Sequence, residues 1–275
     1  MPADDLIDAY QAHLRERSCS ARTIRDYAYH LRRADAGLPQ GLDAVNEQEL
    51  REWLWRGDLK NSSRVVIYAA LTGFYNWCVD TGLFPFAPTD RLIRPRVREG
   101  VPRVANDDTV RMILTEAKQP YRLWATIAAY SGARCIEVFH LTREDITQHA
   151  VLLHGKGAKD RSVPTHPALW AAVKDLPPGP IVDGVPDEQA LSNRFSRYCR
   201  THYGITMSMH RLLCWFATTA YNATKDPRAV QVLLGHTNLA TTTRYIAAAI
   251  PQQRAAVDGL PTFDVDEPEE VEDDE

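Results

Sequence analysis

A proline-rich stretch interrupts a chain that is otherwise patterned as helices, and it limits the possible folds more than any other part of the sequence. Pro85, Pro88, Pro95 and Pro102 fall between residues 85 and 103. Proline fixes an extended backbone and donates no backbone hydrogen bond, so a helix cannot run through this stretch. With 275 residues, the chain is long enough to bury a hydrophobic core on each side of it. The sequence therefore predicts two domains joined by an extended linker.

The residues before the linker have the spacing of a helical bundle. Leu6, Tyr10 and Leu14 recur on one helical face, and Ser20 is a good N-cap for the helix that follows. Asn46, with an acidic residue three positions later, fits a capping box. We expect helices over 4–16, after Ser20, over 47–55, and from Ser62 or Ser63 to Gly82.

The residues after the linker combine helical spacing with one hairpin. Two short segments, 150–154 and 161–165, flank a Gly-containing turn and read as two strands. Helical patterns begin at Asp107 and recur over 123–131, 136–141, 187–202, 210–222, 227–234 and 239–249. We predict a mostly α protein: a helical domain over 1–84, a basic linker over 85–106, an α-rich domain with a small antiparallel β-sheet over 107–255, and an acidic, disordered tail over 256–275.

The charge of the chain is divided unevenly along its length. The net charge is −4, but residues 264–275 carry nine acidic and no basic side chains. Without them 32 basic side chains stand against 27 acidic ones, a net charge of +5, which permits nucleic-acid binding. The tail either keeps the protein soluble or competes with DNA for basic surface. Deleting it distinguishes the two, because only the second role predicts tighter non-specific DNA binding.

Several other classes of protein are excluded. No apolar run is long enough to span a membrane, so we expect no membrane partner. The first ten residues are acidic and helix-patterned, unlike a signal peptide. The cysteines lack C-x-x-C spacing, which indicates reduced thiols in a cytoplasm rather than a zinc site or disulfides. They are Cys19, Cys78, Cys135, Cys199 and Cys214.

Basic side chains gather where they suit contact with DNA phosphates. An extended linker rich in arginine can lie over a phosphate backbone, and arginines at every third helical position share one face. A solvated surface or a merely soluble linker fits the same residues about as well. The candidates are Arg22, Arg25, Lys60 and Arg64 in the N-terminal domain, Arg94, Arg96 and Arg98 in the linker, and Arg194 and Arg197 in the C-terminal domain.

The C-terminal domain holds phosphate-handling side chains but none of the common catalytic motifs. There is no Gly-rich phosphate loop, no G-x-S-x-G elbow and no H-E-x-x-H. Instead Arg134, Lys156, His210 and His236 stand at predicted helix starts or turns. Each by itself fits an ordinary surface residue better than a catalytic one. Their order and spacing carry the functional argument.

Four motifs occur in the order known from one family. They are YSGARCIEVFH at 130–140, GKGAKDRSVP at 155–164, SMHRLLCWFATTAY at 208–221 and VLLGHTNLATTTRYI at 232–246. Together they resemble the tyrosine recombinase or phage integrase family. The resemblance extends over residues 4–250, and the two-domain plan is similar to members without an arm-binding domain. It implies a site-specific recombinase that cleaves and rejoins DNA strands.

The resemblance implies a role for each matching residue. Tyr245 would be the nucleophile that forms a 3′-phosphotyrosine link without a metal or another cofactor. Arg134 would bind the non-bridging phosphate oxygens and stabilise the charge of the transition state. Lys156 would protonate the departing 5′-hydroxyl.

Three further residues would complete this site. His210 would act as an acid–base partner near the nucleophile, and His236 would donate a hydrogen bond to a phosphate oxygen. Glu137 would support the site from behind, although an ordinary exposed helical acid is the alternative for it.

One position departs from the family pattern. The second arginine of the family would stand three residues after His210, where this chain has Leu213. Arg211 is a poor replacement, because it points about 100° away from His210 around a helix. Loss of one donor to a developing oxyanion costs on the order of 10²–10³ in rate.

Three hypotheses follow from this departure. The first is a recombinase slowed or inactivated by Leu213, the second a catalytically silent DNA-binding accessory or regulator, and the third a strand-nicking or topoisomerase-like enzyme. We rank them in that order. The resemblance also implies a homo-tetramer on double-stranded DNA that carries a recombination or attachment site, with a directionality factor as a further partner.

Overall fold

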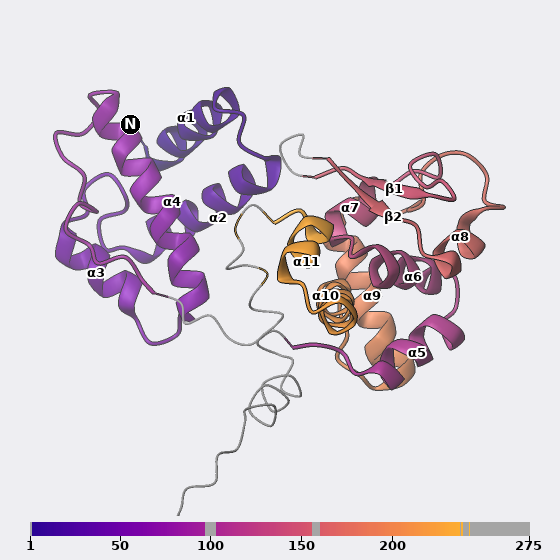
Figure 1. Cartoon of the computed structure of the whole chain (residues 1–275). Helices are drawn as coiled ribbons and strands as arrows, with labels where there is room; N and C mark the ends of the chain where they lie inside the picture. Colours follow the sequence, from indigo (N-terminus) through magenta and orange to yellow (C-terminus); the bar gives the residue numbers. More distant parts are fainter. Residues whose placement is uncertain (1, 97–102, 156–159, 237, 239–241, 243–275) are drawn as a thin grey trace, which may run out of the picture. The chain divides into compact units, whose positions relative to one another are not determined.

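Two helical units account for the described part of the chain (Figure 1). The computed structural model describes residues 2–96, 103–155, 160–236, 238 and 242. The units comprise residues 1–99 and 100–275. Helices dominate both, and one two-stranded antiparallel sheet lies in the second unit, so the predicted fold class is confirmed. None of the helices in these residues is long and apolar enough to cross a membrane.

The N-terminal unit contains four helices. They are α1 (Ala3–Glu16), α2 (Ala21–Gly37), α3 (Glu47–Trp55) and α4 (Asn61–Asp80). The two predicted caps are present: Ser20 Oγ accepts from the Thr23 amide at 3.1 Å, and Asn46 exchanges hydrogen bonds with Glu49 in a capping box. Local sequence thus determines where α2 and α3 begin.

The start of α4 was predicted slightly too late. The helix begins at Asn61 after Lys60, not at Ser62 or Ser63, and the Lys60 carbonyl accepts from the Arg64 amide at 3.0 Å. The prediction relied on a serine side chain as the N-cap. The N-cap is instead Lys60, which has an extended backbone and makes no side-chain cap hydrogen bond. After the helix, Gly82 adopts a left-handed φ of +73°, which agrees with the predicted stop.

The first part of the proline-rich linker packs against the N-terminal unit. No residue of 85–96 is helical, as predicted. Ala87 and Leu92 are nevertheless buried in the same hydrophobic cluster as α1–α4, and Tyr68 donates a hydrogen bond to the Leu92 carbonyl at 3.4 Å. This stretch therefore contributes apolar side chains to a folded core as well as a connection.

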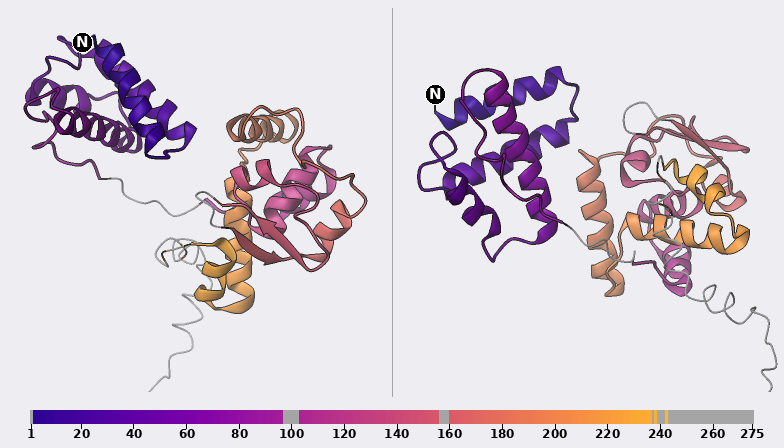
Figure 2. Two further views of the ribbon diagram at one scale, coloured as in Figure 1. Left: turned by 90° about the horizontal axis from the view of Figure 1, so that it is seen from above. Right: turned by 60° about the vertical axis from the view of Figure 1, so that its left-hand side comes forward.

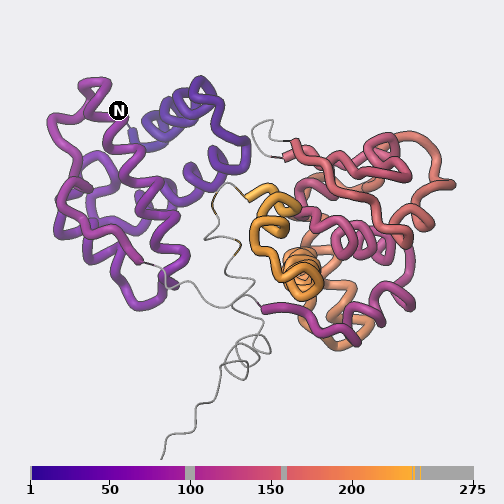
Figure 3. The backbone as a smooth tube through the Cα atoms, in the orientation of Figure 1, coloured from indigo at the N-terminus to yellow at the C-terminus, as the bar shows by residue number. Residues whose placement is uncertain are grey.

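The C-terminal unit is built around α6 (Tyr121–Ser131), which is buried along most of its length. It contacts α5 (Asp107–Glu116), α7 (Cys135–His140), α8 (Pro167–Val173) and α10 (Met209–Thr224). The remaining helices are α9 (Glu188–Tyr203) and α11 (Pro227–Leu234). The short α8 was not predicted, although His166 caps it and Pro167 stands at its first position, a recognised start signal. Figure 3 traces the path from α10 into α11.

The predicted hairpin is formed by β1 (Ala150–Leu153) and β2 (Arg161–Pro164). Val151 pairs with Val163, and Leu153 pairs with Arg161. Both valines are buried while Ser162 is exposed, so alternate side chains face the core. β2 contacts α11, which the two views of Figure 2 place beside the hairpin. This contact joins the hairpin to the helix that precedes His236.

Several predictions fall on residues that the structure does not describe. The helix over 239–249, the acidic tail and the centre of the hairpin turn all lie outside the described residues. The five cysteines are described, and no disulfide joins any of them.

Candidate active site

Arg134 occupies a sharp turn between two helices. α6 ends at Gly132, whose φ is +62°, and Arg134 is the N-cap of α7 with an extended backbone. A Cβ on Gly132 would approach Phe216 to 2.5 Å, so both the left-handed φ and the close packing require glycine there. The prediction that Arg134 stands at a helix start is confirmed.

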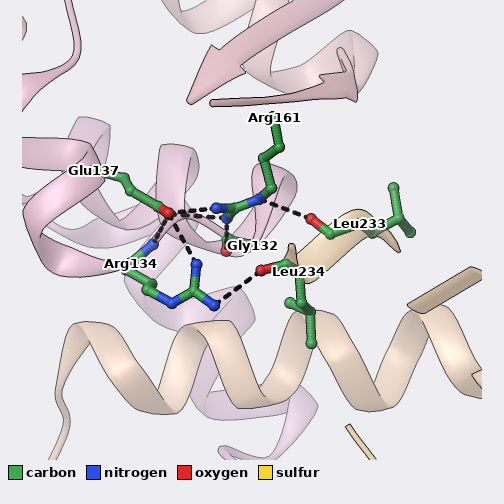
Figure 4. Close-up of polar contacts among 6 residues, drawn as sticks. All are labelled: Gly132, Arg134, Glu137, Arg161, Leu233 and Leu234. Atoms are coloured by element: carbon green, nitrogen blue, oxygen red, sulfur yellow. Dashed lines mark hydrogen bonds and ion pairs between the residues drawn. The ribbon is translucent and has the colours of Figure 1, made fainter. Parts of the chain in front are cut away.

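Glu137 is the centre of the polar cluster shown in Figure 4. Its side chain is 1% exposed, so it is not an ordinary surface acid. Its Oε2 accepts from the Arg134 backbone amide at 2.7 Å, and its Oε1 accepts from Arg134 Nη1 at 2.9 Å. Arg134 Nη2 donates to the Leu234 carbonyl at 2.9 Å. One carboxylate thus fixes both the backbone and the guanidinium of Arg134.

A second arginine, Arg161, binds the same carboxylate and was missed by sequence reasoning. Its Nη1 donates to Glu137 Oε1, and its Nη2 donates to Glu137 Oε2 at 2.8 Å and to the Gly132 carbonyl at 3.1 Å. Its Nε donates to the Leu233 carbonyl at 2.9 Å. Strand alternation was the available signal, because Arg161 stands two residues before the buried Val163 and so shares its face.

The two guanidinium groups also complete the end of α11. Leu233 and Leu234 are its last residues, and their carbonyls have no partner within the helix. Arg161 and Arg134 each occupy one of these carbonyls. Positive charge is favoured at a helix C-terminus, so the cluster stabilises the turn that leads to His236.

His236 follows the left-handed Gly235 and is held through its backbone and ring. Its amide donates to the Gln231 carbonyl at 3.1 Å, and its carbonyl accepts from Gln231 Nε2 at 2.8 Å. Its Nδ1 lies 2.9 Å from Thr242 Oγ1. Burial, followed by the positive charges of Arg134 and Arg161, lowers the pKa of His236 to about 4. The imidazole is therefore neutral near pH 7.

The charges of this cluster do not cancel. Two guanidinium groups carry +2, Glu137 carries −1 and His236 is neutral, so the four side chains sum to +1. An arginine has five N–H donors, and Arg134 uses two side-chain donors on partners among the described residues. The arrangement suits an anion with several acceptor oxygens. No group of three or more metal-binding side chains was found in the described residues.

Leu213 lies in an apolar environment. Its side chain is 2% exposed and packs in a cluster with Cys214, Ala217, Val230 and Leu234. The neighbouring Arg211 donates to the carbonyls of Arg103, Val104 and Thr206. Its guanidinium is thus bound to backbone oxygens, which agrees with the expectation that Arg211 is a poor replacement for the missing arginine.

The other predicted site residues are only partly placed. His210 is exposed in the first turn of α10, after the N-cap Ser208. Tyr245 and Lys156 lie outside the described residues, as does Arg98. The structure therefore brings Arg134, Glu137 and His236 together with Arg161.

The DNA-binding candidates fall into two groups. Arg64 donates to the carbonyls of Leu54 and Arg56 and to Asn61. Its guanidinium therefore satisfies backbone carbonyls at the end of α3. Arg194 donates to the Gly184 carbonyl but remains exposed. The exposed candidates are Arg22, Arg25, Lys60, Arg94, Arg96, Arg194 and Arg197.

Comparison with known proteins identifies the family. Residues 7–82 match the N-terminal SAM-like domain of phage integrases, and residues 184–250 match the phage integrase family. The chain is 29% identical to tyrosine recombinase XerA of Thermococcus onnurineus, over 92% of this chain and 94% of that protein.

Solved structures share the fold. A λ integrase (residues 75–356) dimer bound to a COC′ core site aligns with a TM-score of 0.72 at 18% identity, over 88% of this chain and 94% of that one. A λ integrase tetramer bound to a Holliday junction aligns with a TM-score of 0.67 at 18% identity, over 85% and 77%. The matched segments span both units, and the chain belongs to the phage integrase family of tyrosine recombinases.

Proposed function

We propose that this protein is a site-specific DNA recombinase whose Tyr245 cleaves and rejoins DNA strands. The observation that carries the proposal is the anchored Arg134, which Glu137 and the end of α11 hold beside His236 in a cluster of net charge +1. A phosphodiester supplies one negative charge and two non-bridging oxygens, which complement this cluster.

The proposed reaction is a transfer of one phosphate between two hydroxyl groups. The Tyr245 hydroxyl attacks the phosphorus, a 3′-phosphotyrosine bond forms, and the bond to the 5′-oxygen breaks. Lys156 gives a proton to that oxygen, and His210 takes part in proton transfer at the tyrosine. Arg134 binds the non-bridging oxygens. His236, whose Nδ1 lies 2.9 Å from Thr242 Oγ1, would donate a hydrogen bond to a phosphate oxygen.

The rejoining step is the reverse reaction with a 5′-hydroxyl from another strand. Exchange of both strands of two duplexes requires four cleavages, so we propose four copies of this chain on two DNA sites. The exposed arginines of the two units would bind the phosphate backbone, with Arg64 left out because its donors serve α3. Such binding weakens steeply as salt concentration rises. A directionality factor remains a further proposed partner.

The test requires a DNA target that the protein itself selects. Duplexes bound from a randomised pool are resynthesised with single nicks tiled across the selected sequence, so that a cleaved short strand is lost and the covalent link is trapped. We expect a protein–DNA adduct on a denaturing gel with the wild type. Tyr245→Phe should bind the same duplex with similar affinity but form no adduct.

A second candidate function is a catalytically silent DNA-binding accessory or regulator. The apolar packing of Leu213 and the commitment of Arg211 to backbone carbonyls favour it. In that case both the wild type and Tyr245→Phe bind the selected duplex and neither forms an adduct. The biological effect of the protein would then be unchanged by Tyr245→Phe.

A further inference from the structure

Arg161 connects the three segments that carry the proposed catalytic residues. It is the first residue of β2 and follows the hairpin turn that contains Lys156. Its guanidinium contacts Glu137 in α7 and the Leu233 carbonyl at the end of α11. It also contacts Gly132, two residues before Arg134. The start of β2, the turn before α7 and the end of α11 are therefore joined through one side chain (Figure 4).

Arg161 is placed to act through other residues and not on DNA itself. Its side chain is 9% exposed, and four of the five N–H donors of a guanidinium are used on Glu137, Gly132 and Leu233. Arg134 is more exposed, at 37%, and has more donors to offer. Of the two, Arg134 is suited to the phosphate and Arg161 to the support of Arg134.

The shared carboxylate explains why the second guanidinium matters. With Arg161 present, Glu137 divides its negative charge between two cations. If Arg161 were neutral, Glu137 would neutralise Arg134 alone, and both carboxylate oxygens would be available to its guanidinium. The positive charge offered to an anion would then fall from +1 to zero.

We propose that Arg161 is a positioning residue that keeps the charge and orientation of Arg134 available to the DNA phosphate, and that it supplies the second positive charge absent at position 213. This inference rests on the proposed strand-cleavage function. A purely structural Arg161 would serve stability alone, so the experiment includes measurements that loss of stability does not change.

The experiment uses the full-length chain and the nicked duplex selected by the wild type. Arg161→Gln removes both the positive charge and the planar set of N–H donors of the guanidinium. Arg161→Lys keeps the charge but cannot reproduce the planar arrangement of donors. Arg143→Gln is the matched control, because the guanidinium of Arg143 also binds backbone carbonyls, those of Ile146 and Lys174, which do not belong to the Glu137 cluster. Adduct formation is measured in single turnover, with duplex affinity and thermal unfolding measured in parallel.

We expect Arg161→Gln to bind the duplex within about threefold of the wild type and to form adduct about 10²-fold more slowly. Arg161→Lys should recover only part of that loss, and Arg143→Gln should cleave at the wild-type rate. Glu137→Gln combined with Arg161→Gln should slow cleavage less than the product of the two single effects, because they share one contact. A wild-type rate in folded Arg161→Gln, or full activity in Arg161→Lys, overturns the proposal.

A second readout separates this inference from the proposed function. The carboxylate of Glu137 and the guanidiniums of Arg134 and Arg161 all act on His236. Loss of the Arg161 charge should therefore raise the pKa of His236, followed by NMR of its imidazole. If the wild type forms no adduct, the proposed function fails, and an unchanged His236 titration in folded Arg161→Gln then decides against the positioning role. If Arg161→Gln does not fold, the uncharged Arg161→Met replaces it in the His236 titration, and Arg161→Lys provides the cleavage rate.

Discussion

At the scale of single residues, position 213 and the cluster around Glu137 have opposite environments. Leu213 is enclosed by apolar side chains of α10 and α11. Arg134 and Arg161 instead converge on one buried carboxylate. The α11 helix contributes to both, since Leu234 packs beside Leu213 and its carbonyl accepts from Arg134. A change of side chain at position 213 therefore acts on Leu234, whose carbonyl holds the guanidinium of Arg134.

Leu213→Arg is expected to raise the rate of adduct formation by about 10²-fold, because it restores a donor for the developing negative charge. The same change places a cation where the side chain is 2% exposed. We therefore expect the free energy of unfolding to fall by about 3 kcal/mol. Single-turnover cleavage and denaturant unfolding measure the two effects.

Thr219→Arg is the control for this prediction, because Thr219 is exposed on the same helix. It adds equal charge to α10 without entering the apolar cluster, and neither rate nor stability should change much. If folded Leu213→Arg cleaves no faster than the wild type, the hypothesis that Leu213 impairs catalysis is wrong.

At the scale of elements, the hairpin is closed by an ionisable contact. His154 lies between the two strand ends, with Nδ1 at 3.2 Å from Asp160 and Nε2 at 3.1 Å from Asp145. Hydrogen bonds to Asp145 and Asp160 raise the pKa of His154 above its ordinary value. The contact belongs to the stem of the turn that contains Lys156, so its protonation bears on the stability of that stem.

We expect the His154 contact to stabilise the hairpin stem more at pH 6 than at pH 8. The folded pKa of His154 is raised, so its contribution is complete below the unfolded value of about 6.5 and is lost as the pH rises through the folded value. Hydrogen exchange of the strand amides, corrected for the intrinsic effect of pH, should therefore show more protection at pH 6 than at pH 8.

His154→Asn should remove this pH dependence, whereas His149→Asn, an exposed histidine at the start of the same hairpin, should keep it. Equal pH dependence in the wild type and His154→Asn would show that the contact does not stabilise the stem.

At the scale of the whole molecule, each unit has its own hydrophobic core. The N-terminal core includes Ala87 and Leu92, which are each 6% exposed. We expect a fragment of residues 1–96 to fold alone with a cooperative thermal transition. A fragment ending at residue 84, the predicted domain boundary, lacks both side chains and should be less stable by roughly 2–4 kcal/mol.

Single substitutions in the 1–96 fragment provide the control. Leu92→Ala should reproduce most of the loss, and Ile93→Ala should have little effect because Ile93 is 77% exposed. Circular dichroism during heating and denaturant titration measures both. Equal stability of the two fragments would mean that residues 85–96 add nothing to the fold.

Features that depend on near neighbours could be predicted from local residues alone. Ser20 and Asn46 begin their helices because a short polar side chain caps the nearest free amides. Gly235 ends α11 because it adopts a left-handed backbone readily. The order of the four motifs placed Arg134, Glu137 and His236 in one family pattern, and these three lie in one cluster.

Contacts between distant segments could not be predicted in this way, because they form only when the chain folds. Arg161 and Leu233 are far apart in sequence, and so are Tyr68 and Leu92. Strand alternation turns Arg161 inward, but the chain must fold before Glu137 and two helix-end carbonyls meet it. Arg64 is likewise a DNA-binding candidate by sequence, but in the fold its guanidinium donates to the Leu54 and Arg56 carbonyls at the end of α3. The physical reason is that periodicity determines which face a side chain occupies, whereas packing determines what lies opposite that face.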